Sequence, residues 1–445
     1  MLIKKMYAYD RFPGIVCLSG SGERMTMKKI FFLILGLTLF LSTAACQSDD
    51  TVATTSTAPV TSAKSGEAET EEDAKLLTLT IGGTDLSEYT IVYADSVYDQ
   101  KILSYFNTEH DFFKLIADDI AEKIRQRTGV TLSVVKDTAA AKTNREILVG
   151  PTNRSESDSI DTLDVYKTYV KRVGNKVVVG AGYISTPYTG GLRESYCFAS
   201  TYHAWDKVDA YMQELTASGT ETWDWSAEDD FSTTVDLITV ACIGDSITEG
   251  AGSTARDFLA YPAVLGRILW QDHLIINVGN SGKTMRDDLA LCYRGTTQHA
   301  AVRRYAPLYD YALIMLGTND SYFDRNWTAT DDERYLTSAE NLVADLTKNN
   351  DALQIMIMNC PIYYGTNGSG SQQVRTLQGL LPGRLTDAGY STTFFDMYTF
   401  TAEHLGRENF PDELHPGDTG YQIMAAKLAE VLAALEDGTY SPSES

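Results

Sequence analysis

The sequence of 445 residues has little positive charge. It contains 37 lysines and arginines against 60 aspartates and glutamates, so its formal net charge is −23. Nucleic-acid binding needs a basic surface that contacts phosphates, and this composition argues against a nucleic-acid partner. It also argues against a polyanionic substrate that is held by charge alone. A neutral or acylated substrate fits an acidic protein better.

Cysteine patterns and phosphate-binding motifs are also scarce. The six cysteines form no C-x-x-C pair, and their spacing fits neither a zinc site nor a disulfide framework. Cys242 and Cys360 lie in apolar, strand-like runs and are expected to be buried thiols. The phosphate loop Gly-x-x-x-x-Gly-Lys does not occur. We therefore expect no metal and no cofactor, in an otherwise ordinary globular chain that is long enough for two domains.

The apolar run near the N-terminus, residues 30–41, is too short to cross a bilayer comfortably, which takes roughly 20 residues. Lysines precede it and small residues follow, so residues 1–45 are expected to be a secretory signal peptide, with translation starting at Met25 or Met27. Small residues directly before Cys46 resemble a bacterial lipobox. We expect lipidation of this cysteine and anchoring at the extracellular face of the cell membrane. The alternative is ordinary cleavage and secretion.

Composition and periodicity divide the rest of the chain. Residues 46–75 are rich in Ser, Thr, Ala and Glu and predict a flexible tether. A mixed pattern over 76–219 predicts a smaller α/β domain, and the acidic stretch 220–236 with its two tryptophans is interpreted as a linker. Strand-like and helix-like segments alternate over 237–437, which predicts an α/β fold with a parallel sheet and helices on both faces. Residues 438–445 form a short tail.

Within residues 76–219, apolar residues at helical spacing before Gly129 predict a helix that stops at this glycine. A hairpin is expected over 166–182, and a last helix over 201–215. The hairpin and the segment 145–154 resemble the small non-catalytic α/β domain in front of some glycoside hydrolases, such as α-glucuronidases and β-hexosaminidases. This resemblance implies an accessory domain beside a carbohydrate-active enzyme.

The alternating elements of the C-terminal domain can be placed by their periodicity. Strands are expected at 237–243, 274–278, 311–316, 353–359 and 393–397. Helices are expected around 261–270, 297–305, 338–349, 371–389 and 420–435.

Four motifs in this domain follow strands or precede a helix. The first, Gly244-Asp245-Ser246, puts a serine at the carboxyl end of a strand, where open α/β sheets bind ligands. The others are Gly279-Asn280-Ser281-Gly282, Gly317-Thr318-Asn319-Asp320 and Pro411-Asp412-Glu413-Leu414-His415. Occurring in this order, the motifs resemble those of the SGNH (GDSL-type) esterase and lipase superfamily. The resemblance implies a three-layer α/β/α domain and a carboxylic ester hydrolase.

The residue types in these motifs suit ester hydrolysis, which needs a nucleophile, a base, a group that orients the base, and donors for the oxyanion. Ser246 is the expected nucleophile, and His415 is the expected base because imidazole titrates near neutral pH. Asp412 precedes this histidine by one turn and would fix its tautomer. The family resemblance assigns the oxyanion donors, which are the backbone N–H groups of Ser246 and Gly282 and the side-chain amide of Asn319.

Each of these residues also has an ordinary structural interpretation. Asn319 could be a turn residue, Gly282 a helix-entry glycine and Asp412 a helix N-cap. Asp412 and its histidine could bind a metal, but two ligands alone make a poor site. Asp245 is expected to tie its loop together, and the resemblance assigns no role to Asp320.

An O-acetylated polysaccharide, or another acylated small molecule, is the expected partner. Export, the accessory-domain resemblance and the segment 261–265, which resembles the helix start of bacterial acetylxylan esterases, favour this substrate. Two alternatives stay open: a lysophospholipase or lipase that acts on longer acyl chains, and a carbohydrate-binding surface lipoprotein with a vestigial esterase domain. Tyr322, Phe323 and Trp327 could line the pocket of either enzyme. The linker tryptophans are expected to pack on a domain surface rather than to stack on a sugar.

Overall fold

The computed structural model describes residues 76–95, 111–182, 193–323, 327–365 and 371–442. The expected signal peptide, the expected lipidation site Cys46 and the expected tether lie outside these residues. Within the described ranges, no helix combines the length and the apolar composition that crossing a membrane requires.

The N-terminal domain contains a five-stranded sheet in the order β4-β3-β5-β7-β6. Its strands are β3 (Thr90–Tyr93), β4 (Ser133–Lys136), β5 (Glu146–Val149), β6 (Thr168–Val173) and β7 (Lys176–Ala181). Only β6 runs antiparallel, because it forms the expected hairpin with β7. Helix α3 (Phe112–Thr128) buries an apolar stripe and ends where predicted, at Gly129, whose φ of 73° is the left-handed conformation of a helix C-cap. Short 3-10 helices cover Leu86–Glu88 and Ser155–Thr162.

The expected single helix over 201–215 is wrong, because the structure has two helices here. Helix α4 (Arg193–Ala204) and helix α5 (Asp206–Ala217) are separated at Trp205. The indole of Trp205 is 1% exposed and packs against Trp225, with 5.8 Å between ring centroids. Neither glycine nor proline marks this break, so periodicity alone reads through it.

Part of the expected linker also belongs to the N-terminal domain. Strand β8 (Thr222–Trp225) pairs in parallel with β1 (Thr78–Ile81), which also pairs with β2 (Thr84–Asp85). Trp223 and Trp225 are 8% and 0% exposed and stack with centroids 5.2 Å apart, so they pack in the core of the domain rather than on its surface, where they were expected. The alternation of these tryptophans with polar residues is the period of a half-buried strand, and it corrects the linker interpretation for this segment.

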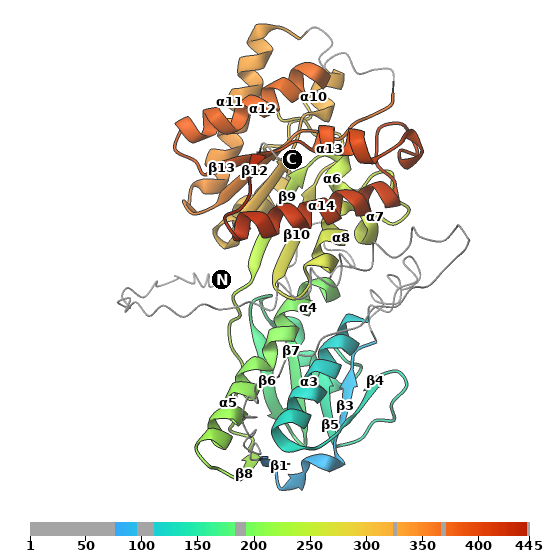
Figure 1. Ribbon diagram of the computed structural model, residues 1–445, viewed down its shortest axis with the longest axis vertical. Helices are drawn as coiled ribbons and strands as arrows, with labels where there is room; N and C mark the ends of the chain where they lie inside the picture. The colour runs from blue at the N-terminus through green and yellow to red at the C-terminus, as the bar shows by residue number, and fades with distance from the viewer. Residues whose placement is uncertain (1–75, 96–110, 183–192, 324–326, 366–370, 443–445) are drawn as a thin grey trace, which may run out of the picture. The chain divides into compact units, whose positions relative to one another are not determined.

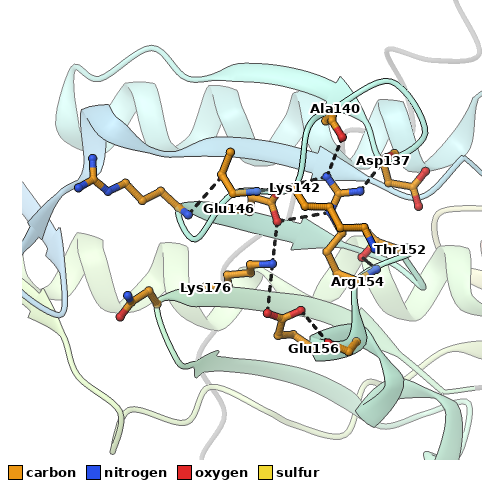
Figure 2. Close-up of polar contacts among 12 residues, drawn as sticks. Asp137, Ala140, Lys142, Glu146, Thr152, Arg154, Glu156 and Lys176 are labelled. Atoms are coloured by element: carbon orange, nitrogen blue, oxygen red, sulfur yellow. Dashed lines mark hydrogen bonds and ion pairs between the residues drawn. The ribbon is translucent and has the colours of Figure 1, made fainter.

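A buried ion network holds the strands of the N-terminal sheet to the following loop (Figure 2). The side chains of Arg154 and Glu146 are each 1% exposed, and Arg154 Nη2 lies 3.0 Å from Glu146 Oε1. Lys176 bridges Glu146 and Glu156 at 3.0 and 3.1 Å. Burial raises the pKa of Glu146, but the hydrogen bonds from Arg154 and Lys176 outweigh this effect, so its pKa lies below the ordinary value.

The C-terminal domain is built on a fully parallel sheet in the order β10-β9-β11-β12-β13. The strands are β9 (Ile238–Gly244), β10 (His273–Gly279), β11 (Tyr311–Met315), β12 (Gln354–Met358) and β13 (Thr392–Phe395). The helices are α6 (Ser246–Glu249), α7 (Arg256–Leu259), α8 (Tyr261–Ile268), α9 (Thr297–Tyr305), α10 (Thr318–Phe323), α11 (Ala329–Thr347), α12 (Ser371–Asp387), α13 (Met397–His404) and α14 (Asp418–Glu436), with 3-10 turns at Ala306–Leu308 and Arg407–Asn409.

Helices cover both faces of this sheet (Figure 1). Successive residues of β9 enter different cores: Val240 and Cys242 pack in one cluster with α8 and α14, whereas Ala241 and Ile243 pack in another with α9, α11 and α12. Both faces are apolar because parallel sheets are covered on both sides. The expected three-layer α/β/α architecture is therefore confirmed.

Candidate active site

Ser246 lies directly after strand β9, at the carboxyl edge of the sheet. The carboxylate of Asp245 caps α6 by accepting the Ile247 N–H at 3.0 Å, so it ties this loop together as expected. Asp245 is 1% exposed, and this burial raises its pKa to about 6. Helix α6 ends after one turn at Gly250, whose φ is 103°. The serine therefore lies at the N-terminus of a short helix that begins where a central strand ends.

The structure brings Ser246, His415 and Asp412 together. The imidazole Nε2 of His415 lies 2.8 Å from the Ser246 hydroxyl oxygen, and its Nδ1 lies 2.6 Å from Asp412 Oδ2. The other carboxylate oxygen of Asp412 accepts the backbone N–H groups of Leu414 and His415 at 3.0 and 2.7 Å. Burial raises the pKa of Asp412, but these hydrogen bonds outweigh it and hold the pKa below 3.8. Asp412 is thus an acceptor at neutral pH, which favours the His415 tautomer with its proton on Nδ1.

A strained turn shapes the loop that carries this histidine. Glu413, between Asp412 and Leu414, has a φ of 67°, and no other non-glycine residue of the described ranges has a positive φ. Such a conformation costs roughly 1–2 kcal/mol for an L-residue. The Glu413 carbonyl accepts the Tyr364 N–H at 2.7 Å, and its carboxylate pairs with Arg407. These contacts hold the strained turn, which allows both backbone N–H groups after it to reach Asp412.

A second loop, residues 250–254, lies directly against His415. A Cβ added to Gly252 would lie 2.7 Å from the His415 Cβ, so only glycine fits between the two loops. The Tyr421 hydroxyl donates to the Ala251 carbonyl at 2.6 Å, which fixes this loop to α14. Gly252 and Tyr421 were not among the residues expected in the site. The glycine had a recognisable signal, because it lies close to the first motif, whereas nothing in the sequence pairs the tyrosine with that loop.

The expected oxyanion donors follow three neighbouring strands of the sheet, β10, β9 and β11. Gly282 has a φ of 74°, which explains why a glycine is needed, and no atom lies within 4 Å of the position of its missing Cβ. Asn319, on α10, donates from its side-chain amide to the Lys283 carbonyl at 3.0 Å. This bond uses one of the two amide hydrogens and fixes the orientation of the other.

Asp320 has a structural role that the sequence did not indicate. Its carboxylate is fully buried and accepts the backbone N–H groups of Met285 and Arg286 at 2.8 and 2.9 Å. Burial raises its pKa to about 6. Arg286, itself 2% exposed, pairs with Asp331 at 2.9 Å. Asp320 therefore links α10 to the loop after Gly282, through backbone groups that leave no trace in the sequence.

The remaining site expectations concern aromatic residues and cysteines. The Trp327 indole donates to Asp332 at 2.7 Å, and the Arg286 guanidinium lies 5.2 Å above its ring, so this tryptophan packs within the domain. The side chains of Tyr322 and Phe323 lie outside the described residues. Cys242 and Cys360 are both free thiols. Cys242 is fully buried as expected, whereas Cys360 was expected to be buried and is half-buried.

The parallel sheet is covered by helices on both faces, and at its carboxyl edge three residues are hydrogen-bonded to one another: Ser246, His415 and Asp412. This combination defines an α/β/α hydrolase domain. Residues 242–423 match the GDSL-like Lipase/Acylhydrolase family, and this C-terminal region is a domain of that family.

Similar proteins include esterases that act on carbohydrates. An acetylxylan esterase of Xylanibacter ruminicola is 39% identical over 92 residues, which are 21% of this chain and 18% of that protein. Among solved structures, a family two carbohydrate esterase from Clostridium thermocellum in complex with cellohexaose has 18% identity and a TM-score of 0.35 over 49% of this chain and 70% of that one. The M. Smegmatis aryl esterase has 17% identity and a TM-score of 0.35 over 45% of this chain and 100% of that one. The similarity to the acetylxylan esterase thus spans less than a fifth of its length.

Proposed function

We propose that this protein is a serine esterase that hydrolyses O-acyl esters, with O-acetyl groups on carbohydrate as its substrate. The observation that carries the proposal is the unbroken hydrogen-bond chain from Asp412 through His415 to Ser246. Such a chain activates a hydroxyl that is otherwise a weak nucleophile. The membership of residues 242–423 in an acylhydrolase family supports the same reaction class.

In the proposed reaction, Ser246 Oγ attacks the ester carbonyl carbon while His415 Nε2 takes the hydroxyl proton. The backbone N–H groups of Ser246 and Gly282 and the Asn319 amide donate to the oxyanion of the tetrahedral intermediate. His415 then returns the proton to the leaving alcohol, and the acyl group stays on the serine. A water molecule repeats the sequence, releasing the carboxylic acid and restoring Ser246. Asp412 stays ionised throughout and stabilises the imidazolium.

The acetylated-carbohydrate substrate is supported by the similarity to an acetylxylan esterase. The expected accessory domain, residues 76–219, points to the same class of substrate by resemblance to domains that accompany glycoside hydrolases.

A substrate series tests this proposal directly. Purified protein is assayed with p-nitrophenyl esters of increasing acyl length and with acetylated xylan. We expect turnover of acetyl esters and release of acetate from xylan, and a loss of roughly six orders of magnitude in kcat for Ser246→Ala. Ser133→Ala, at an exposed serine of the N-terminal domain, is the matched control with unchanged kcat.

The outcomes separate the alternatives. A preference for long acyl chains would replace the acetylesterase with a lipase or lysophospholipase. Glycan binding without turnover of any ester would identify a binding lipoprotein whose esterase domain is vestigial.

We further propose that the chain is exported and anchored to the outer face of the cell membrane through a lipid on Cys46. The small residues before this cysteine support the proposal. Cells fed a radiolabelled fatty acid should label the wild-type protein and not Cys46→Ser. Equal labelling of both would contradict lipidation at this position.

A further inference from the structure

The carboxylate of Glu249 joins two of the expected catalytic segments. Glu249 is the last residue of α6, the helix that begins with Ser246. Its Oε2 accepts the Ser281 backbone N–H at 2.6 Å and also the Ser281 hydroxyl. Its Oε1 accepts a hydrogen bond of 3.0 Å from Arg256. One side chain therefore crosses from the helix of the nucleophile to the turn that follows β10.

The residue that Glu249 holds directly precedes Gly282. The start of this turn is fixed by close packing, because the Asn280 N–H donates to the Gly244 carbonyl at 2.9 Å and Gly279 lies against the backbone of α6. Its end is fixed where the Lys283 carbonyl accepts the Asn319 amide at 3.0 Å. Between these points, the bond to Glu249 fixes the peptide group before Ser281.

Gly282 needs such support because a glycine rotates its adjacent peptide groups easily. Its φ is 74°, and an added Cβ would meet no atom within 4 Å beyond its chain neighbours, so side-chain packing does not hold this position. A long hydrogen bond of 3.3 Å, from the Lys283 N–H to the Asn280 carbonyl, closes the turn around it. A donor contributes to an oxyanion hole only when it already points at the position of the oxyanion. The anchored N–H of Ser281 limits how far the following N–H can rotate.

We propose that Glu249 is a positioning residue of the esterase reaction, which fixes the Gly282 N–H for the developing oxyanion through its bonds to Ser281. The inference depends on the proposed function, because it assigns a role within that reaction. Glu249 touches no reacting atom. It acts through Ser281, and its side chain is 21% exposed, so it adds little to the core.

The chemistry of the carboxylate explains why a glutamate suits this position. An ionised carboxylate only accepts hydrogen bonds, and here it accepts from a backbone N–H, a hydroxyl and a guanidinium at once. Glutamine has one accepting oxygen, and its NH₂ group would have to face either Ser281 or Arg256, which are both donors. Glu249→Gln therefore keeps the size of the side chain while weakening the anchor, and Glu249→Ala removes the anchor completely.

The experiment measures kcat and KM for p-nitrophenyl acetate in the wild type, Glu249→Gln and Glu249→Ala. We expect kcat to fall about 10- to 100-fold in Glu249→Ala and less in Glu249→Gln, within the 10²- to 10³-fold limit for loss of a whole donor. KM should stay within about 3-fold, because the lost interaction is made only in the transition state. Glu333→Ala is the matched control. Glu333 is an exposed glutamate of α11 paired with Arg384, and this variant should keep wild-type kcat.

A second reagent makes the result independent of the substrate. A fluorophosphonate reacts with an activated serine, and its addition passes through a similar negatively charged centre. We expect rapid labelling of the wild type, slow labelling of Glu249→Ala and no labelling of Ser246→Ala. Thermal unfolding midpoints within a few degrees of the wild type would show that the slow labelling is not caused by unfolding.

The possible outcomes distinguish the two proposals. A wild-type protein that neither reacts with the fluorophosphonate nor turns over any ester would overturn the proposed function. An active wild type with Glu249→Ala and Glu249→Gln at wild-type kcat would overturn the role of Glu249 and leave the esterase proposal standing. A rise in KM at constant kcat would equally overturn it, because that result indicates ordinary substrate binding. If Glu249→Ala does not fold, Glu249→Gln decides the question.

Discussion

Replacement of Arg154 by methionine tests the buried ion network of the N-terminal domain (Figure 2). The Arg154 guanidinium donates to the Glu146 carboxylate at 3.0 and 3.4 Å, to the Asp137 carbonyl at 2.6 Å and to the Ala140 carbonyl at 3.3 Å. Methionine retains much of the aliphatic stem and removes every one of these donors. The substitution therefore isolates the polar contribution from the packing contribution.

The expected magnitude follows from what stays buried afterwards. Without Arg154, the Glu146 carboxylate keeps only Lys176, at 3.0 Å, and the Thr143 N–H, at 3.1 Å, and two backbone carbonyls lose a donor. Removing one partner of a buried pair costs about 3–5 kcal/mol, which is a large share of the ordinary 5–15 kcal/mol of a domain. The pKa of Glu146 is lower in the folded protein than in the unfolded chain. The network therefore stabilises the fold fully at pH values above the pKa of Glu146 in the unfolded chain, and this stabilisation is lost as pH falls through its pKa in the folded protein. The effect of Arg154→Met should therefore shrink in acid.

Urea unfolding followed by tryptophan fluorescence measures this effect, since Trp205, Trp223 and Trp225 are buried in the same domain. The control is Arg145→Met, the same substitution at an exposed pair with Glu88, which should cost about 0–1 kcal/mol. Esterase activity of the folded protein should be unchanged in both variants. The reasoning is refuted if Arg154→Met lowers the free energy of unfolding no more than Arg145→Met does.

Two further variants test the active site and an ionised histidine. Asn319→Ala should lose about 10²- to 10³-fold in kcat with the fold retained, whereas Asn341→Ala, at an exposed asparagine, should not; equal activities in a steady-state assay would contradict the oxyanion role. The Asp206 carboxylate, hydrogen-bonded to His203 at 2.8 Å, and the Asp272 carboxylate, 3.6 Å from its Nε2, raise the pKa of His203 from 6.5 to about 9. The contribution of this histidine to stability is therefore complete below pH 6.5 and is lost as pH rises through 9. His203→Gln should flatten the dependence of unfolding free energy on pH over this window by about 1–2 kcal/mol, because both partner carboxylates are about half exposed and solvent weakens the pairs; parallel curves for the two proteins would exclude this contribution.

The elements that the sequence predicts well are the ones whose apolar pattern is set by burial. The run 311–316 was predicted as a strand and is β11 (Tyr311–Met315), because a strand covered on both faces is apolar throughout. The helix predicted over 338–349 is α11 and starts earlier, at Ala329. Its first turns are polar and carry no apolar periodicity, and the capping box of Thr328 and Asp331 marks the true start.

In the candidate site, the expected nucleophile, base and orienting residue were predictable from the sequence, whereas the residues that support them were not. The positions of Ser246, His415 and Asp412 were predictable because their motifs combine residue type with order along the chain, and the structure brings them within hydrogen-bond distance. Their catalytic roles stay predictions. The supporting residues were not predictable, because Glu249 and Asp320 hold backbone N–H groups. Almost every residue has a backbone N–H, so the sequence does not indicate which of these groups donates a hydrogen bond to a given carboxylate.

The carboxylates around Ser246 divide into two kinds with opposite effects on stability. Asp412 has a lowered pKa, so its bonds to the His415 loop stabilise the fold at neutral pH. Asp245 and Asp320 have pKa values raised by burial from 3.8 to about 6. The folded state therefore binds protons more tightly than the unfolded chain at these two groups, and their ionisation lowers stability by up to about 3 kcal/mol each as pH rises from 3.8 to 6. Asp320 nevertheless needs its charged form, because both of its oxygens accept backbone N–H groups of the loop after Gly282, whereas Asp245 accepts the Ile247 N–H beside the nucleophile with one oxygen. Conformational stability is thus exchanged at neutral pH for a fixed arrangement of donors, which is the requirement of a reaction that depends on preorganised hydrogen bonds.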